Sequence, residues 1–545
     1  IIGISFMKYL LKSVAIFFVV TLLLSCNTLK QPKEVFVPID YTEQDVISAE
    51  IQRINELKKD FPVMALWRSE LLKDEQTIKE NQENVFLLLQ QAIEKKDFFS
   101  AVKYYVSLES VKYKNLDKIN YTKNELYKNY LMDVPGLVVD KKLLPKTVAD
   151  CINATVTIWV DKGIRIENGA GYADRVIGSG FFIDKRGYIV TNHHVISDLV
   201  DPKHESYTRL YIKLARDSET RIPAKVVGYD SLLDLALIKA EVEPPFILEL
   251  GTSSDLQIGD KVSAIGTPLG LHGTITSGIV SAVDRKLFTT GNVLQIDAAV
   301  NSGNSGGPCI DANMKVQAIV FAGIMQYQGL NFAIPVEYLR QDLPFLYNGG
   351  KRNHSWIGAY GHTMKEGLKN TGLEIQYVMP GGTASRADIK KGDVITFVDN
   401  KRVYSLENMQ DILRNYGSEV IISCNYQRDG ESKATLLYLD ERPKYPGYEI
   451  YKSDLISNSF IPIFGMELVS ASGHSQRKFV ISDILKGSVA DESGFSVTDP
   501  VYVSGIDFSE KKDAIAIQIN TRRKKRGYLD VSIMLTSSLD SPYYF

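Results

Sequence analysis

From Val148 to about Tyr347, short runs of β-branched and other apolar residues alternate with glycine-containing turns. These runs include TVTIWV, GFFID, YIVTN, RLYIKL, DLALIKA and DKVSAIG. Short runs that recur along a chain between turn residues are typical of an all-β barrel or sandwich. We therefore predict that residues 146–347 form one all-β domain.

A glycine-rich loop, AAVNSGNSGGPCID (residues 298–311), surrounds Ser305 late in this region. Acyl transfer needs a hydroxyl nucleophile and backbone N–H groups aimed at the oxygen that becomes negative. Glycine lets a loop turn its amides inward and admit a substrate. We predict an oxyanion hole at Gly303, Asn304 and Ser305, with the N–H groups of Gly303 and Ser305 as donors. Taken alone, the loop is equally compatible with a plain turn.

Two other segments supply the remaining groups of a serine hydrolase. His194, the second histidine of TNHHV, follows one predicted strand, and Asp234 precedes another. The histidine can take the proton of the serine, while the carboxylate fixes the tautomer and stabilises the imidazolium. The chain order His194, Asp234, Ser305 is that of the chymotrypsin-like arrangement. A lone aspartate at this position would otherwise cap a turn or form an ion pair.

A series of motifs now resembles one known family. GSGFFID, GYIVTNHHV, DLALIK, GTPLGL, TSGIVSA, DAAVNSGNSGGP and GLNFAIP occur in the order found in HtrA/Deg (DegP-like) proteases. The chain resembles these proteases closely over residues 177–337 and more loosely beyond. The resemblance implies a multidomain fold: an all-α N-terminal segment, an all-β chymotrypsin-like double β-barrel and two α+β PDZ domains. It places His194, Asp234 and Ser305 at the catalytic positions.

The resemblance also implies a function. It predicts an ATP-independent serine endopeptidase of the bacterial cell envelope that degrades misfolded or unfolded proteins and can act as a chaperone. It predicts a homotrimer or a larger homo-oligomer. The wall of the specificity pocket is expected from GLNFAIP and the preceding VFAG strand. Neither segment contains an acidic residue, so we expect cleavage after medium-sized apolar residues and not after Lys or Arg.

The rest of the chain holds two units that repeat one scheme, residues 355–441 and 456–545, joined by ERPKYPGYEIYKSD as a linker. PDZ domains add extended peptides to a sheet edge and capture a C-terminal carboxylate with backbone amides. In the first unit, SWIGAYG resembles the carboxylate-binding loop. Ile357, Gly358 and Ala359 would then supply the amides for substrate C-termini or regulatory peptides, and a plain strand entry is the alternative.

The second unit departs from the family pattern. IFGME, with Gly465 at its centre, stands at the equivalent loop position. DAIAIQIN alternates apolar and polar residues with period two where the family has a helix, and such alternation is typical of a strand. A peptide groove in this unit is therefore in doubt.

The N-terminal stretch MKYLLKSVAIFFVVTLLLSC, residues 7–26, has lysines at its start and an apolar run from Ser13 to Leu24. This run is short for a membrane-spanning helix and typical of a signal peptide. LLSC resembles a bacterial lipobox. We predict that residues 1–26 are a signal peptide and that Cys26 is lipidated, which makes the protein a periplasmic, membrane-anchored lipoprotein. An ordinary signal peptide and an uncleaved anchor are the alternatives.

Residues 27–145 are predicted to be helical, because apolar residues in DVISAEIQRINEL recur at helical spacing. The segment NVFLLLQQAIEKKDFFSAVKYY resembles one tetratricopeptide-type helical hairpin. Such repeats usually need several copies to share a core. A helical spacer or an oligomerisation element is the alternative.

The totals exclude some classes of function. A formal net charge of −2 gives no electrostatic argument for nucleic acid binding, and the four cysteines lie far apart without metal-ligand spacing. We expect no nucleic acid partner, no metal and no cofactor. Two other functions stay open: a PDZ scaffold or holdase whose barrel no longer cleaves, and a protease dedicated to one envelope substrate.

Overall fold

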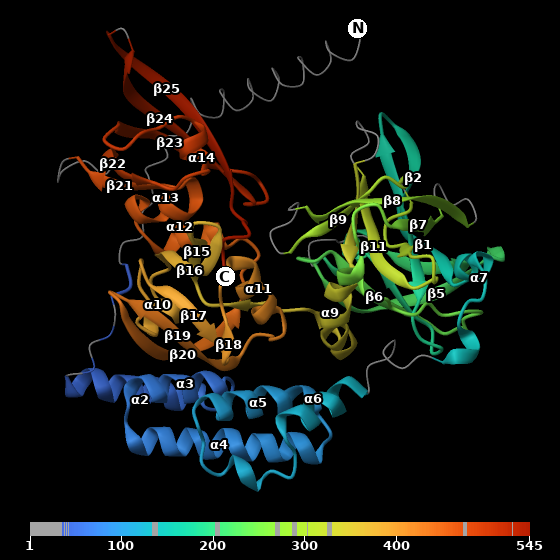
Figure 1. Ribbon diagram of the computed structural model, residues 1–545, viewed down its shortest axis with the longest axis horizontal. Coiled ribbons are helices and arrows are strands. Elements are labelled where there is room, and N and C mark those ends of the chain that lie inside the picture. The colour runs from blue at the N-terminus through green and yellow to red at the C-terminus, as the bar shows by residue number, and fades with distance from the viewer. Residues whose placement is uncertain are drawn as a thin grey trace.

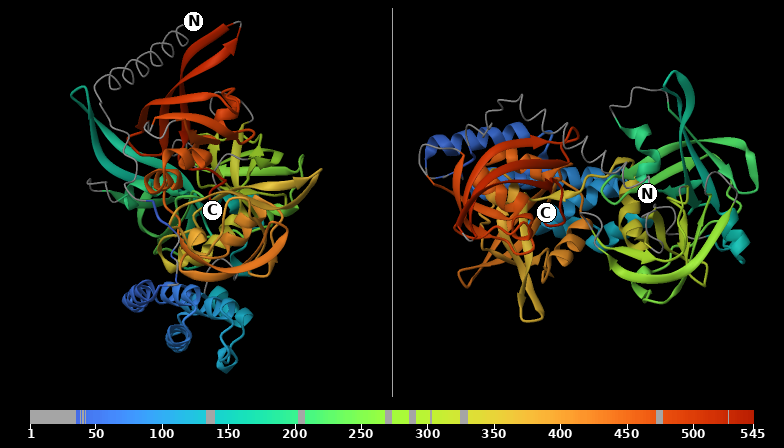
Figure 2. Two further views of the ribbon diagram at one scale, coloured as in Figure 1. Left: turned by 90° about the vertical axis from the view of Figure 1, so that its left-hand side faces the viewer. Right: turned by 90° about the horizontal axis from the view of Figure 1, so that it is seen from above.

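The computed structural model describes residues 35–37, 39, 41, 43–132, 140–201, 208–267, 273–285, 291–301, 303–323, 330–471, 477–525 and 527–545. The predicted signal peptide and Cys26 lie outside these residues. A helical layer, a pair of β-barrels and two sheet domains make up the described chain (Figure 1). Seen from above, the barrels lie beside the two sheet domains (Figure 2). The predicted fold class is confirmed.

The helical layer consists of antiparallel helices that pack on the first sheet domain. Its helices are α2 (Gln44–Leu57), α3 (Pro62–Leu72), α4 (Glu75–Glu94), α5 (Phe98–Ser110), the 3₁₀ turn Leu116–Lys118 and α6 (Lys123–Met132). Buried apolar side chains of α3 to α6 form one continuous core with those of the sheet domain, whereas α2 packs on α3 through Ile54. Trp67 donates its indole N–H to the carbonyl of Leu436, 2.8 Å away. The layer is therefore not a free spacer, because its inner face is covered.

The double barrel is built from strands within the region predicted to be all-β. Its first half comprises α7 (Val148–Asn153), β1 (Thr155–Glu167), β2 (Ala170–Phe182), β3 (Tyr188–Thr191), α8 (His193–Val200), β4 (Arg209–Leu214), β5 (Asp217–Asp230) and β6 (Leu235–Ala240), after a 3₁₀ turn at Lys141–Leu143. Its second half comprises the 3₁₀ turn Ser253–Asp255, β7 (Lys261–Gly266), β8 (Thr274–Arg285), β9 (Val293–Ile296), β10 (Pro308–Ile310), β11 (Val316–Gly323), β12 (Asn331–Pro335) and α9 (Val336–Asn348).

Both halves close on themselves. The first sheet runs β5-β4-β1-β2-β3-β6, and β6 also pairs with β5; the second is a closed barrel in the order β10-β11-β12-β9-β8-β7. Each barrel encloses an apolar core of its own. A third apolar cluster lies between the barrels and α9. Short strand β13 (Gly350–Lys351) pairs in parallel with β5 and leads the chain out of the barrels.

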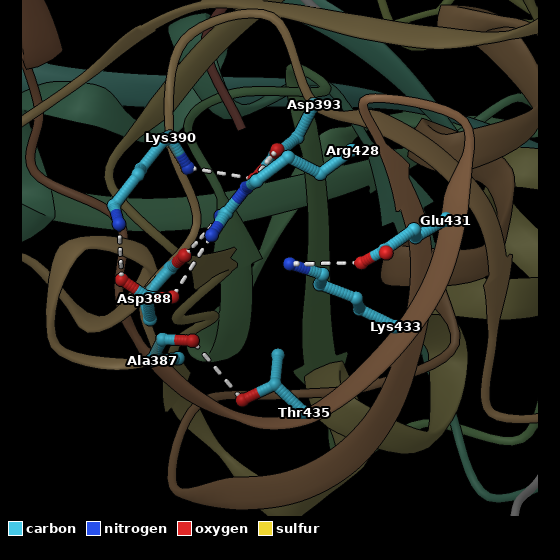
Figure 3. A network of polar contacts seen from close by, with 8 residues as sticks. All are labelled: Ala387, Asp388, Lys390, Asp393, Arg428, Glu431, Lys433 and Thr435. Atoms are coloured by element: carbon cyan, nitrogen blue, oxygen red, sulfur yellow. Dashed lines mark hydrogen bonds and ion pairs between the residues drawn. The ribbon is translucent and has the colours of Figure 1, made fainter.

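The first sheet domain corresponds to the predicted unit 355–441, which we label PDZ1 after that expectation. Its strand order is β14-β20-β19-β17-β16-β15, with β18 beside β17. Its elements are β14 (Ser355–Trp356), β15 (Ala359–Glu366), β16 (Lys369–Val378), α10 (Thr383–Arg386), β17 (Val394–Val398), β18 (Lys401–Arg402), α11 (Leu406–Arg414), β19 (Val420–Arg428) and β20 (Glu431–Glu441). Arg428 donates to both Asp388 (2.9 Å) and Asp393 (2.7 Å), which holds the loop after α10 against the β19–β20 hairpin (Figure 3).

The second sheet domain, PDZ2, differs from the sequence expectation at both ends. Its elements are α12 (Pro446–Ser453), α13 (Ile456–Phe464), β21 (Met466–Ser470), β22 (Lys478–Ile484), α14 (Val489–Glu492), β23 (Pro500–Phe508), β24 (Ala514–Lys525) and β25 (Gly527–Ser538). Helix α12 occupies part of the segment expected to be a linker. Pro446 stands in its first turn, where proline is tolerated, so this residue does not prevent the helix. Residues 543–545 lie against PDZ1 and not within PDZ2.

The period-two segment of PDZ2 is a strand. DAIAIQIN forms the start of β24, which lies between β23 and β25 in the sheet order β21-β22-β23-β24-β25. Gly465, at the centre of IFGME, caps α13 with a left-handed φ of 77°. In the described part of PDZ2, no helix intervenes between β23 and β24 to form the second wall of a groove.

Candidate active site

Strand register brings His194 and Asp234 together. Strands β3 and β6 are antiparallel neighbours, with Thr191 opposite Ala236. Continuing this register past the strand ends places the start of α8 beside the residue that precedes β6. The Nδ1 atom of His194 lies 2.7 Å from Oδ2 of Asp234. Because Nδ1 faces the carboxylate, Nε2 is the ring nitrogen left for a substrate or a nucleophile.

Asp234 is held from several directions. Its Oδ1 atom accepts the backbone N–H of His194 at 2.8 Å, and its carbonyl accepts the side-chain amide of Asn192 at 2.9 Å and the N–H of His193 at 3.2 Å. Its φ of 55° lies in the left-handed region, which aspartate tolerates better than most residues. The carboxylate is therefore fixed behind the imidazole, as a tautomer-holding group must be.

The glycines of the Ser305 loop have different roles. Gly303 adopts a φ of 101°, which disfavours a side chain. A Cβ at Gly306 would lie 2.2 Å from the carbonyl oxygen of Ser179, and one at Gly307 would lie 2.1 Å from that of Ile265. The loop therefore lies against both barrels, and only glycine permits that approach.

Ser305 lies at this junction, but it does not hydrogen-bond to His194 among the described residues. Its hydroxyl donates to the backbone carbonyl of Phe321 on β11, 3.2 Å away. The backbone N–H of Asn304 donates to Asn301 within the turn. No backbone hydrogen bond engages the N–H of Gly303 or of Ser305 in the described part of the chain. Among the described residues, the N–H groups of Gly303 and Ser305 thus have no hydrogen-bond partner, whereas that of Asn304 is engaged.

The sequence analysis did not predict a role for Ser179, although this residue lies in the motif GSGFFID. Its buried hydroxyl donates to the carbonyl of Gly303 at 2.6 Å and accepts the N–H of Thr267 at 3.0 Å. Its backbone N–H donates to the carbonyl of Ser305 at 2.8 Å. Ser179 thus ties the Ser305 loop to both barrels.

His193 packs away from this centre. Its ring stacks on Tyr229 with centroids 5.2 Å apart. Burial lowers the pKa of His193, and the charge of Asp234 opposes this only in part. Because its ring is stacked on Tyr229, we assign His193 a structural role and no chemistry.

A buried ionic cluster supports the turn that carries Asp234. Asp230, at the start of this turn, accepts a hydrogen bond from Nε2 of His354 at 2.7 Å. Arg352 lies 2.6 Å from Asp342 and 3.8 Å from Asp230. Burial would raise the pKa of Asp230, but His354 and Arg352 outweigh it and lower the pKa. Burial lowers the pKa of His354, and the neighbouring Asp230 opposes this only in part.

The predicted PDZ1 residues lie at one end of its sheet edge. Ile357 and Ala359 are fully buried, and Gly358 has a φ of 79°. The N–H of Ala359 donates to the backbone carbonyl of Phe545 at 3.0 Å.

Across the described ranges, no group of three His, Cys, Asp or Glu residues could hold a metal ion. No helix among the described residues is both long and apolar enough to cross a membrane.

Comparisons with known proteins agree with this geometry. Residues 178–319 match the trypsin-like peptidase domain, 374–424 a PDZ domain, 447–539 the TP0546 family PDZ domain and 45–130 a domain of unknown function. A probable periplasmic serine endoprotease DegP-like of Bartonella henselae is 35% identical over 279 residues, which is 49% of this chain and 54% of that protein. Serine protease PepD of Mycobacterium tuberculosis is 34% identical over 314 residues, which is 54% of this chain and 65% of that protein.

The chain thus spans roughly half to two thirds of the length of these curated relatives. Among solved structures, an HtrA-type protease AlgW with decapeptide is 25% identical, with a TM-score of 0.46 over 55% of this chain and 99% of that one.

Proposed function

From the premise that this is an HtrA/DegP-like chain, with a trypsin-like peptidase domain and PDZ domains, we propose that it is a serine endopeptidase. In this proposal Ser305 is the nucleophile, His194 the general base and Asp234 the residue that orients the base. The N–H groups of Gly303 and Ser305 form the oxyanion hole. The doubly hydrogen-bonded His194–Asp234 pair is the observation that carries the proposal.

The reaction follows from the positions of these groups. The Ser305 hydroxyl leaves the Phe321 carbonyl and turns toward Nε2 of His194, which takes its proton as Oγ attacks the scissile carbonyl. The oxyanion of the tetrahedral intermediate accepts hydrogen bonds from the two free N–H groups. His194 returns the proton to the leaving amine, and the peptide remains as an ester on Ser305. Water, deprotonated by His194, then releases the acid and restores the serine.

We propose unfolded or misfolded proteins of the bacterial envelope as substrates, cleaved without ATP. The relatives named as periplasmic serine endoproteases support the location and the endoproteolytic activity. Cleavage is expected after medium-sized apolar residues, since the described parts of β11 and β12 contain no acidic residue that would pair with Lys or Arg. We also propose lipidation at Cys26 and assembly into a homotrimer or larger homo-oligomer.

Casein degradation by residues 27–545 tests the activity. We expect the parent protein to degrade casein and to be labelled by a fluorophosphonate at Ser305. Ser305→Ala should abolish the labelling and lower turnover by at least about 1,000-fold, because it removes the nucleophile. The exposed-site variant Leu529→Ala serves as a control that retains both properties.

One observation favours the alternative of a non-cleaving scaffold or holdase. The Ser305 hydroxyl is directed at Phe321 and not at His194. Hydrogen bonds of this kind often form only once a substrate is bound, so we prefer the enzyme. Equal, negligible casein turnover by the parent and by Ser305→Ala, with no labelling of either protein, would favour the scaffold.

A further inference from the structure

Residues 543–545 pair with β15, the edge strand of the PDZ1 sheet. Strand β15 is the last in the sheet order and pairs with β16 on one side only. On its other side, Ala359 and Phe545 exchange two backbone hydrogen bonds of 3.0 Å, and the N–H of Gly361 donates to Tyr543 at 3.2 Å. Tyr360 pairs with Tyr544 in antiparallel register. These residues therefore extend the PDZ1 sheet by one antiparallel strand.

The side chains of this strand alternate between two surfaces, as they must in an extended segment. Phe545 is 2% exposed and belongs to the core cluster of PDZ1 that also contains Ile357. Tyr543, two residues earlier, stacks on His362 with ring centroids 4.1 Å apart. Tyr544 points the other way, and its hydroxyl donates to the carbonyl of Pro462 in α13 at 2.9 Å.

Further contacts anchor the segment from outside the strand. Gln410 on α11 donates its side-chain amide to the carbonyl of Pro542. Arg442, just after β20, forms an ion pair of 2.6 Å with Asp540, and both side chains are largely buried. Figure 1 places this end of the chain, marked C, beside β15 and α11 and far from the tip of β25. The segment thus leaves PDZ2 and lies between β15 and α11 of PDZ1.

A peptide that binds by strand addition needs the same backbone groups. The N–H of Ala359, one of the predicted peptide-binding groups, is already paired with Phe545. The Phe545 side chain is also buried in the apolar core of PDZ1. An external ligand can therefore enter only when residues 541–545 leave.

We propose that residues Ser541–Phe545 are an intramolecular ligand of PDZ1. The external ligand of the same groove is then an extended peptide with aromatic residues at alternate positions, and it binds by displacing this segment. This regulation rests on the peptide-binding role of PDZ1 in the proposed function. A tethered competitor acts at a high effective concentration, in the millimolar range for a short connection, so the groove is closed to weak ligands and open to strong or abundant ones.

Peptide binding tests the proposal in the full chain carrying Ser305→Ala, which prevents cleavage. The probe is a fluorescein-labelled Ser-Pro-Tyr-Tyr-Phe peptide, followed by fluorescence anisotropy. We expect Phe545→Ala to bind the probe at least about tenfold more tightly than the parent, because the internal competitor is weakened. Leu529→Ala, which alters an exposed apolar residue of β25, should bind like the parent. Equal affinities for the parent and Phe545→Ala, or no binding by either, would overturn the proposal.

Hydrogen exchange supplies a second readout that detects a folding defect. The amides of Ala359 and Gly361 should be protected in the parent, lose protection in Phe545→Ala and regain it with the peptide. The amides of β19 should exchange alike in both proteins if PDZ1 remains folded. Unchanged protection at 359 and 361 would contradict the proposal. Both readouts are independent of catalysis, so a failure of the protease assay leaves them interpretable.

Discussion

At the scale of the residue, one contact of the proposed catalytic triad is missing: the Ser305 hydroxyl does not hydrogen-bond to His194 among the described residues. His194 and Asp234 are fixed by backbone and side-chain contacts, whereas Ser305 donates to Phe321. Before it can be activated, the Ser305 hydroxyl has to exchange the Phe321 carbonyl for His194 as its acceptor. The loop itself is held by Ser179, whose hydroxyl bonds to Gly303 and Thr267. Catalytic readiness should therefore depend on Ser179, which does not contact the reacting atoms.

We predict that Ser179→Ala lowers kcat by about tenfold or more with a smaller change in KM. The substitution leaves the buried N–H of Thr267 and the carbonyl of Gly303 without this partner, a cost of about 1–3 kcal/mol for such a group, and about 1.4 kcal/mol corresponds to tenfold in rate. The rate of fluorophosphonate labelling at Ser305 should fall in parallel. Ser277→Ala, at an exposed position of β8, is the matched control. An unchanged labelling rate in a folded Ser179→Ala protein would refute a positioning role.

At the scale of the element, local patterns predicted strands and motifs but not distant pairings. The β-branched runs predicted the strand-rich barrels, and the period-two alternation of DAIAIQIN was a sign of β24. The contacts of Asp230 with His354 and of Ala359 with Phe545 join residues far apart in the chain. No spacing rule connects such positions, because the geometry that joins them depends on how whole domains pack. For the same reason, the sequence did not predict that the helical layer packs on PDZ1.

The Asp230–His354 contact predicts a pH dependence of stability. Burial, with Arg352 and Arg442 nearby, lowers the pKa of His354 in the folded protein, and Asp230 opposes this only in part. The unfolded chain then binds a proton that the folded chain does not, so stability is complete above the ordinary histidine pKa of about 6.5 and declines as the pH falls toward the folded value.

We therefore expect the Tm of the parent to fall between about pH 7.5 and about pH 5.5, which bracket the ordinary histidine pKa. His354→Gln, which stays neutral, should show a smaller fall measured by differential scanning fluorimetry. His193 and His362, whose pKa values burial also lowers, leave a residual dependence in the variant. An equal fall in both proteins would show that His354 does not titrate across this range.

At the scale of the whole molecule, PDZ1 is the body that the other parts contact. The helical layer shares its core, residues 543–545 complete its sheet, and His354 links it to the peptidase domain. Leu232, two residues from Asp234, lines the same small cavity as Tyr544 and Phe545. Exchange of the segment in the PDZ1 groove therefore takes place next to the turn that positions the proposed catalytic aspartate.

The proposed lipidation of Cys26 predicts that the protein associates with membranes. If Cys26 carries lipid chains, the protein should partition with membranes, since acyl chains contribute about 0.8 kcal/mol per buried CH₂. Expressed in a bacterial host, the parent should be found in the membrane fraction and should incorporate a labelled fatty acid. Cys26→Ala should lose the label. Retention of the label by the Cys26→Ala protein would exclude this cysteine as the lipid site.

The shared core between the helical layer and PDZ1 predicts that the two unfold together. Trp67 on α3 is 1% exposed, donates to Leu436 on β20 and lies with its ring 5.7 Å from that of Tyr438. Trp67→Ala removes a large buried side chain, which typically costs about 3–5 kcal/mol. Hydrogen exchange should accelerate at β20 as well as in α3, whereas Leu87→Ala, at an exposed position of α4, should change neither. Faster exchange confined to α3 would mean that the helices and PDZ1 are separate cooperative units.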